Sequence, residues 1–258
     1  MSDLLMRDDA PISAEIWEKI DDMVVSVFKK VVVGRKLIPM MGPIGWGFEQ
    51  TPLFKFTQED GAYVTTEPND YVSLKDLQQE FMLRAKQLFI AQQTPFDLDL
   101  GAVALAAMEL AKAEDRVVLG GLVEKAGCHG ELGDWNTIGG PFAAVAGAVA
   151  QLRITGFDGP YGLVLSPTMF ARLASLMEYG RREIDMVQKL VTVGIYQWPD
   201  MDDDKVIVLS PQSWNMDMVV GQDVVTAWLG NEKLDHLFRV FESVALRVKR
   251  PGGICVLQ

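Results

Sequence analysis

The chain has 258 residues, of which 49% are hydrophobic and 23% are charged, and its formal net charge is −11. This acidity argues against nucleic acid as a partner, because neutralising phosphates requires clustered Lys and Arg. No apolar run reaches the ~18 residues of a membrane-spanning helix and the N-terminus lacks a signal-peptide pattern, so we expect a cytoplasmic protein with no membrane partner.

The first third of the chain predicts an arm, a helix and a ribbon. Residues 1–12 read as an arm, and Ser13 can cap a helix over 13–31, whose apolar residues recur at helical spacing. Residues 48–71 are short, alternating and interrupted at 59–61, which predicts a two-stranded ribbon. An isolated ribbon is marginal in water, so we expect it to lie across another subunit.

A long helix is predicted over residues 95–121, with Asp97 or Asp99 as its cap and the glycine pair at 120–121 as its end. One face is mostly alanine and can approach another element closely. Glu114 lies near the middle of that face, where an unpaired carboxylate would be costly. We interpret it as half of an ion pair with an arginine from elsewhere; a catalytic carboxylate is the alternative.

Strands and helices alternate over residues 127–220, which predicts an α/β subdomain. Residues 74–89 fit either a helix or a strand leading into a helix, and residues 127–130 read as a turn. Helices are predicted over residues 142–153, 167–178 and 182–193, and strands over 161–165, 206–209, 218–229, 238–249 and 254–257.

The reactive side chains form no convincing active site. Cys128 beside His129 suggests a nucleophile and its base, as in a hydrolase, but adjacent side chains seldom face each other. The acidic turn at 200–204 begins like a calcium loop but lacks the required Gly and Glu. The glycines at 139–140 could bind an anion at a helix N-terminus, although a helix stop and start explains them equally well.

The number and spacing of the cysteines predict the redox environment of the protein. The chain has two, Cys128 and Cys255, which lie far apart in the sequence and form no CxxC motif. This usage fits a reducing cytoplasm. We expect no metal site, since the chain cannot readily assemble enough Cys or His ligands for zinc.

Several short motifs follow one another along essentially the whole chain. They are Gly34-Arg35-Lys36, Gly42-Pro43-Ile44-Gly45-Trp46, Ala113-Glu114-Asp115, Gly159-Pro160-Tyr161, Val164-Leu165-Ser166-Pro167 and Gly221-Gln222-Asp223. Through them the chain resembles the encapsulins, nanocompartment shell proteins of bacteria and archaea that are related to the linocin-type bacteriocins. Each motif alone is weak, but their order and spacing make the resemblance specific.

The resemblance implies an α+β chain with the Hong Kong 97-like phage major capsid fold. Its expected parts are an N-terminal arm and helix (1–47), an extended loop (48–72), a peripheral domain with the spine helix (73–126 and 221–258) and an axial domain (127–220). The implied function is that of a shell protomer, not an enzyme, which self-assembles into an icosahedral cage. A prophage major capsid protein of the same fold is the alternative.

The resemblance also implies partners. Encapsulin shells enclose cargo proteins that carry a short C-terminal targeting peptide, frequently ferritin-like iron oxidases or dye-decolourising peroxidases. We therefore expect such a cargo and a role in iron storage or oxidative stress protection. Some encapsulins bind flavin through an aromatic residue on the strand before the spine, but the matching position here is Lys86, so no cofactor is expected.

Two sites follow from the same resemblance. In the family the cargo peptide docks between the first helix and peripheral-domain strands, which points to Phe28, Val31, Arg35, Leu37, Asp223 and Val225. Ordinary core packing is the alternative for each. The loop around the five-fold axis would comprise Met177, Glu178, Tyr179, Gly180, Arg181, Arg182 and Glu183.

Overall fold

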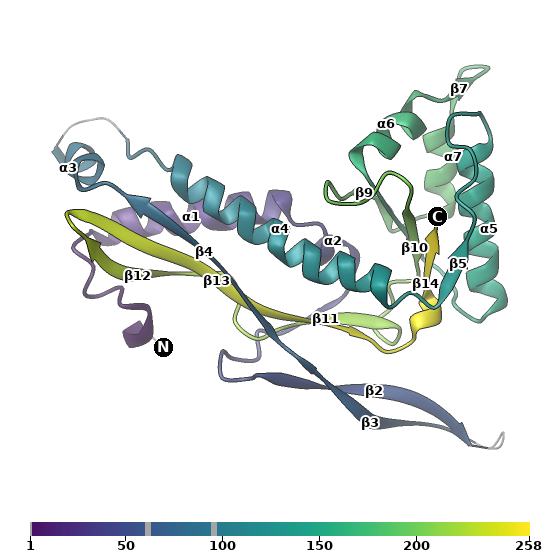
Figure 1. The fold of residues 1–258 in the computed structure, drawn as a ribbon, viewed down its shortest axis with the longest axis horizontal. Helices are drawn as coiled ribbons and strands as arrows, with labels where there is room; N and C mark the ends of the chain where they lie inside the picture. Colours follow the sequence, from purple (N-terminus) through teal and green to yellow (C-terminus); the bar gives the residue numbers. More distant parts are fainter. Residues whose placement is uncertain (1, 60–62, 94–96) are drawn as a thin grey trace.

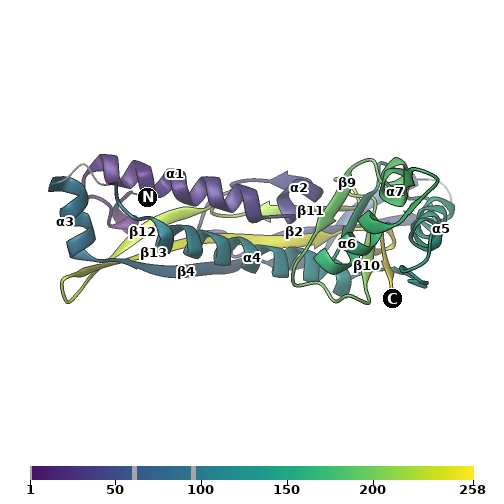
Figure 2. The same cartoon turned by 90° about the horizontal axis from the view of Figure 1, so that it is seen from above.

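The computed structural model describes residues 2–59, 63–93 and 97–258. The molecule is elongated: helix α4 (Gly101–Glu124) runs along a first sheet, and a second sheet with its own helices stands at one end (Figure 1). Viewed from above, α1 (Ala14–Val31) lies beside α4 along the same part of the molecule (Figure 2). Both long helices thus cover the first sheet.

Strand β13 (Asp235–Val248) organises the first sheet. It pairs antiparallel with β4 (Lys75–Leu83) along one edge, and with β12 (Val225–Glu232) and β11 (Met216–Val220) along the other; β1 (Met40–Met41) adds parallel to β11. The register sets Phe81 of β4 opposite Phe238, with ring centroids 5.2 Å apart. The aromatic pair lies in the core beneath the helices.

Helix α1 forms as its sequence predicts. The Ser13 hydroxyl oxygen accepts a hydrogen bond from the Ile16 N–H at 3.3 Å, which confirms the predicted cap. Ile20 and Phe28 are buried in the core that α1 shares with α4 and β13. Burying a side chain of this size contributes about 1.5–3 kcal/mol.

The predicted N-terminal arm is tied to the body of the molecule. A short 3-10 helix, η1 (Ser2–Leu5), contacts β12. Arg7 then forms a bidentate ion pair with Asp21 of α1, at 2.6 and 2.8 Å, and donates to the carbonyl oxygen of Thr226 at 2.9 Å. These bonds fix the start of the chain against α1 and β12.

Helix α4 differs from its prediction at both ends. It begins at Gly101, whose N–H donates to the Asp99 carboxylate at 2.9 Å, and it continues to Glu124, past the glycines expected to end it. A Cβ added to Gly121 would lie 2.8 Å from a methyl carbon of Leu246 on β13. The glycine therefore permits close packing of the helix on the sheet and does not terminate it.

The second sheet has the strand order β5 (Cys128–Gly130), β14 (Ile254–Leu257), β10 (Val206–Leu209), β6 (Gly162–Leu165) and β9 (Gly194–Gln197). Helices α5 (Gly140–Ile154), α6 (Pro167–Ser175) and α7 (Glu183–Leu190) accompany it (Figure 1). Side chains alternate along β14: Ile254 and Val256 enter the core shared with α4, while Cys255 and Leu257 enter the core beneath α5–α7.

The expected boundaries of the peripheral domain (73–126 and 221–258) and the axial domain (127–220) assign two strands to the wrong sheet. Strand β14, from the segment 221–258, pairs with β5 and β10 of the second sheet, and β11, from the segment 127–220, pairs with β13 of the first. Continuous sequence boundaries cannot capture this arrangement, because the chain crosses between the sheets before β11 and again before β14. The short helix η2 (Pro251–Gly253) lies at the second crossing.

The predicted ribbon consists of β2 (Gln50–Glu59) and β3 (Tyr63–Ser73), which pair antiparallel and extend away from the body (Figure 1). Most of its predicted turn, at 60–61, lies outside the described residues. Arg247 of β13 holds the base: it forms two bonds of 2.7 Å to Asp217 and donates to the Thr51 hydroxyl at 3.2 Å and the Pro52 carbonyl at 3.1 Å.

The remaining elements refine the sequence predictions. Strand β4 leads into α3 (Ala85–Gln93), which confirms the strand-then-helix alternative for 74–89. The strand expected over 218–229 is interrupted between β11 and β12, and the turn predicted at 127–130 is instead β5. A hairpin of β7 (Met177–Glu178) and β8 (Arg181–Arg182) shortens both neighbouring helices, α6 and α7.

Candidate functional site

A groove of about 430 Å³ lies between the C-terminal half of α1, the short helix α2 (Gly34–Leu37) and the segment before β12. Its α1 residues, Val25, Phe28 and Lys29, occupy one stripe because they follow helical spacing, and Val32, the residue that caps the C-terminus of α1, continues it. Phe28, 3% exposed, belongs to the floor, while Val25 is 41% exposed at the rim. The lining residues are Val25, Phe28, Lys29, Val32, Arg35, Lys36, Met40, Asp223 and Val224.

Arg35 is bound by three carboxylates from three distant segments. Its guanidinium donates to Glu114 of α4 at 2.8 Å, to Asp223 at 2.7 Å and to Glu242 of β13 at 2.6 Å. The side chains of Glu114 and Glu242 are fully buried, whereas that of Asp223 is 49% exposed. The guanidinium also lies 4.9 Å from the centroid of the Phe28 ring. Arg35 thus joins α2, α4 and β13 beneath the groove.

The two buried glutamates share this cation. Burial raises the pKa of both Glu114 and Glu242, and the charge of Glu114 raises that of Glu242 further. The two carboxyl groups are within hydrogen-bonding reach of each other, yet the Oε1 atom of each is buried without a partner among the described residues. Burial lowers the pKa of Arg35, but the attraction of Glu114 and Glu242 outweighs it and the guanidinium stays charged.

The corner between α1 and α2 is fixed to α4 by Asp115. Its carboxylate accepts hydrogen bonds from the Val33 N–H at 2.9 and 3.0 Å and from the Gly34 N–H at 2.8 Å. Burial raises the pKa of Asp115 to about 6, although these two backbone donors oppose the rise. A Cβ on Gly34 would lie 2.9 Å from a methyl carbon of Val118, so the corner requires glycine.

The structure separates the six residues expected to bind the peptide. Phe28, Arg35 and Asp223 line the groove. Val31 packs against the core between α1 and α4, Val225 begins β12, and Leu37 is buried in the core shared by the two sheets. Leu37 is turned away because α2 changes direction at Gly34. Sequence reasoning missed Val25 of α1 and Val32 at its C-cap, and both could have been found from their helical spacing to Phe28 and Lys29.

Glu114 has the partner that its sequence position predicted. The buried carboxylate pairs with an arginine, Arg35, which lies 79 residues away along the chain. The pair connects two helices, so its observed role is structural.

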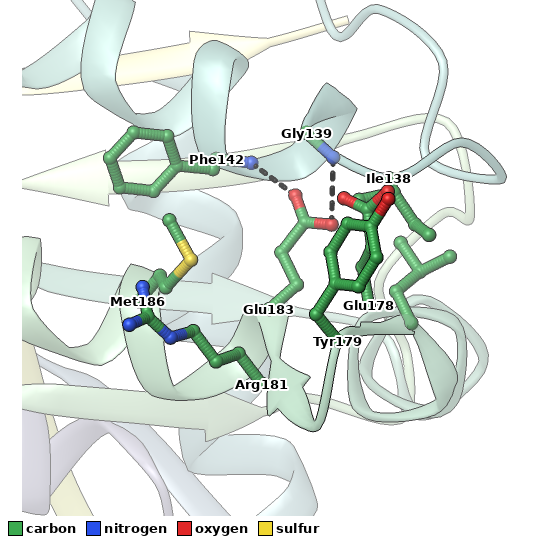
Figure 3. A pocket seen from close by; sticks show the side chains of 9 residues that line it. Ile138, Gly139, Phe142, Glu178, Tyr179, Arg181, Glu183 and Met186 are labelled. Atoms are coloured by element: carbon green, nitrogen blue, oxygen red, sulfur yellow. Dashed lines mark hydrogen bonds between the residues drawn. The ribbon is translucent and has the colours of Figure 1, made fainter.

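The second expected site is the hairpin of β7 and β8 (Figure 3). Tyr179 and Gly180 form its tip with positive φ angles of 48° and 75°, and Tyr179 is 96% exposed. Met177, Glu178, Arg181 and Arg182 are also exposed. The hairpin, with Ile138, Phe142 and Met186, encloses a cavity of about 590 Å³.

Glu183 differs from the rest of the predicted loop, because it is buried at the start of α7. Its carboxylate accepts hydrogen bonds from the N–H groups of Gly139 and Phe142, each at 2.9 Å (Figure 3). These are free donors at the N-terminus of α5, where a negative charge is stabilising. Of the two interpretations of the glycine pair 139–140, an anion site or a helix stop and start, the anion position at this helix N-terminus is occupied by a carboxylate of the chain itself.

The other sequence candidates do not form sites. Cys128 is buried and His129 exposed on β5, where successive side chains point to opposite faces, so they cannot act as nucleophile and base. In the acidic turn, Asp200 pairs with Arg116 at 2.5 Å and Asp202 with Lys205 at 2.6 Å. Across the described residues, no group of three side chains could hold a metal ion. In the same ranges, no helix has the length and apolar character needed to cross a membrane.

Comparisons with known proteins identify the family to which the chain belongs. The Linocin_M18 family, described as encapsulating protein for peroxidase, matches residues 1–245. The chain belongs to the encapsulin family. The type 1 encapsulin shell protein EncA of Myxococcus xanthus is 30% identical over 280 residues, covering 100% of this chain and 97% of that protein. A diheme-cytochrome-encapsulin shell fusion protein of Kuenenia stuttgartiensis is 32% identical, covering 96% and 74%.

Solved structures confirm the expected fold of this encapsulin. The virus-like particle from Pyrococcus furiosus superposes with a TM-score of 0.84 at 24% identity, covering 95% of this chain and 100% of the other. A phage-related protein from Bordetella bronchiseptica gives 0.65 at 15% identity, covering 96% and 97%. The chain therefore has the Hong Kong 97-like capsid fold, and it is an encapsulin shell protomer that forms a capsid-like cage.

Proposed function

We propose that this encapsulin loads its shell by binding a short C-terminal peptide of the cargo protein in the groove over α1 and α2. The observation that carries the proposal is the groove itself. The groove is lined by the apolar side chains of Val25, Phe28, Val32, Met40 and Val224, of which Val25 is 41% and Met40 50% exposed. A short peptide gains affinity mainly by placing an apolar anchor in such a preformed recess.

The charges around the groove determine which polar contacts a peptide can make. Arg35 already donates to three carboxylates, so it serves as a rigid part of the floor and not as a free cation for the peptide. Lys29 and Lys36 are exposed, and half of the Asp223 side chain is accessible. These three groups can set the direction and register of a bound peptide, since rim charges act mainly on specificity.

We also propose the class of cargo and the place of the shell. The cargo is a ferritin-like iron oxidase or a dye-decolourising peroxidase in a cytoplasmic compartment for iron storage or oxidative stress protection. The description of the matching family refers to a peroxidase. A relative from Pyrococcus furiosus, 25% identical over 248 residues, is a ferritin-like-encapsulin shell fusion protein. Both names support an oxidative cargo.

The hairpin tip is the proposed pore element at the five-fold axis. The hairpin of β7 and β8 extends from the second sheet and its helices, away from the core (Figure 1), and its exposed residues include Tyr179, Arg181 and Arg182. Copies related by an axis beside this tip would bring their hairpins together. The mixture of glutamate and arginine there would then set the local charge that solutes meet.

The test of the groove is Val25→Asp, compared with Ser26→Asp as a matched control. Val25 is a partly exposed lining residue, so a charge there leaves the fold intact but must be desolvated beneath a bound peptide. Ser26 is exposed on the same helix about 100° away, outside the groove lining. Cargo per shell is measured by mass spectrometry on shells purified from native cells.

We expect Val25→Asp to lower cargo per shell at least tenfold and Ser26→Asp to leave it unchanged, with normal particles in both by electron microscopy. Deleting the last ~10 residues of the cargo identified in wild-type shells should reproduce the loss. Wild-type cargo content in Val25→Asp shells would show that loading uses another surface.

A further inference from the structure

The two cysteines of the chain meet in the second sheet. Cys128 and Cys255 are separated by 127 positions in a sequence with two cysteines in all. Strands β5 and β14 pair in parallel, and the register places Cys255 directly opposite Cys128. A pair that looks unrelated in the sequence is therefore a cross-strand neighbour pair.

Both side chains lie on the same face of the sheet. Cys128, Cys255 and Leu257 belong to the apolar core beneath α5–α7, whereas Ile254 and Val256 point to the opposite core. Cys255 is fully buried and Cys128 is 8% exposed. Both are free thiols, close enough to hydrogen bond to each other. Helix α5 contacts both strands.

We propose that Cys128 and Cys255 are a peroxide-responsive thiol pair, which forms an intrachain disulfide that locks the C-terminal strand to β5. Paired strands lie ~4.8 Å apart, which is within the range of ~4.4–6.8 Å between the Cα atoms of a disulfide. The bond is uncharged, so it suits the apolar core better than a thiolate does.

The oxidant is hydrogen peroxide, and each step balances. The sulfur of Cys128 attacks peroxide, an S–O bond forms as the O–O bond breaks, and the departing hydroxide takes the thiol proton to leave as water. Cys128 is then a sulfenic acid. The sulfur of Cys255 attacks that sulfur, the S–S bond forms as the S–O bond breaks, and a second water leaves with the proton of Cys255. Two thiols lose two electrons in total, and peroxide gains them.

The difference in exposure between the two cysteines decides which one reacts with peroxide and which one forms the disulfide. Cys128 retains some exposure and reacts with peroxide first, whereas Cys255 resolves the sulfenic acid from within the core. Burial, with the neighbouring thiol, raises the pKa of Cys255, which disfavours its attack on peroxide in solution; Cys255 reacts instead with the sulfenic acid held opposite it on β5.

The bond would stabilise the subunit by closing a long loop. Cross-linking residues 127 positions apart restricts the unfolded chain strongly, and in a chain of 258 residues the melting temperature should rise on the order of 10 °C. The bond would also protect the last strand of the chain from opening, since it ties β14 to its neighbour.

The experiment uses intact wild-type shells, fully reduced and then incubated with or without hydrogen peroxide. Thiols are alkylated after unfolding, and the chain and its peptides are weighed. We expect two alkylated cysteines before peroxide and none after it, a chain lighter by two hydrogens, and one peptide pair joining Cys128 to Cys255. Dithiothreitol should reverse the change, and thermal scans should show the rise in melting temperature.

Cys128→Ala and Cys255→Ala are the matched controls, and peroxide should raise the melting temperature of neither. The decisive measurement is made on the wild type, so it stands even if a variant folds poorly. Cysteines that remain alkylatable, that oxidise separately to sulfinic acids or that link different chains would each overturn the proposal. A disulfide that forms without raising the melting temperature would overturn its locking role.

Discussion

Replacing Arg35 by methionine tests how much the cluster beneath the groove contributes to stability. Methionine keeps most of the aliphatic bulk beside Phe28 but removes the guanidinium. Glu114 and Glu242 would then lie in the core, fully buried, with no cation between them. Asp223 would lose the same partner, but its half-exposed side chain can be solvated by water.

The expected loss of stability in Arg35→Met follows from the burial of the two glutamates. Removing one partner of a buried ion pair costs about 3–5 kcal/mol, because the remaining charge is uncompensated. Asp223 adds little, since exposed pairs contribute at most about 1 kcal/mol. For a chain of this size, 1 kcal/mol lowers the melting temperature by about 2–4 °C, so Arg35→Met should lose roughly 10 °C at neutral pH. The loss should shrink as the pH falls, because both glutamates then bind protons and need no cation.

The assay is thermal unfolding of assembled shells at several pH values. Arg239→Met is the matched control, since its pair with Glu80 lies at the surface and its removal should cost under about 1 kcal/mol. Adding Glu242→Gln to Arg35→Met should recover part of the lost stability by removing one buried charge. If Arg35→Met melted no lower than Arg239→Met at neutral pH, the cluster would not be the structural joint inferred from its geometry.

Three further predictions concern the same joint and the ribbon. Burial holds the pKa of Glu242 above its usual range, so the stability that protonated Glu242 contributes is present at low pH and is lost as the pH rises through that raised pKa. The Glu242→Gln variant lacks this titration. Its melting temperature should therefore fall less than that of the wild type from about pH 5 to 9 in a series of thermal scans. Gly34→Ala places a methyl group 2.9 Å from Val118 and should cost about 1–3 kcal/mol, measured as a lower melting temperature; an unchanged value would show that the corner can relax. Deleting residues 52–68 should leave soluble protein without shells in electron micrographs, because we expect the ribbon to lie across a neighbouring subunit, and normal particles would contradict that role.

Individual helices and strands were predictable where the apolar residues of a segment follow one clear spacing. The helix expected over 13–31 is observed as Ala14–Val31 with Ser13 as its cap, and the strand expected over 254–257 has those bounds. Turns and ends were harder, because a glycine can end a helix or permit close packing. Gly121 shows the second case, since Leu246 of another element decides its role.

The candidate site was predictable only in part. Phe28 and Arg35 line the groove, but Leu37 does not, since the corner at Gly34 turns it into another core. The sequence could indicate that Glu114 needs a cation, because an apolar helix face makes a lone carboxylate costly. It could not indicate that Glu242 shares this cation.

What the sequence by itself determined is therefore the pattern within each segment: which face of α1 is apolar, which residues alternate, and which family the ordered motifs resemble. The tertiary structure alone decided which segments meet. It placed the Glu183 carboxylate on the N-terminus of α5, and it brought Cys128 and Cys255 into register. The spacing of apolar residues shows only whether one face of a helix or strand is buried or exposed. Contacts between residues far apart in the sequence depend on the order in which the strands pair.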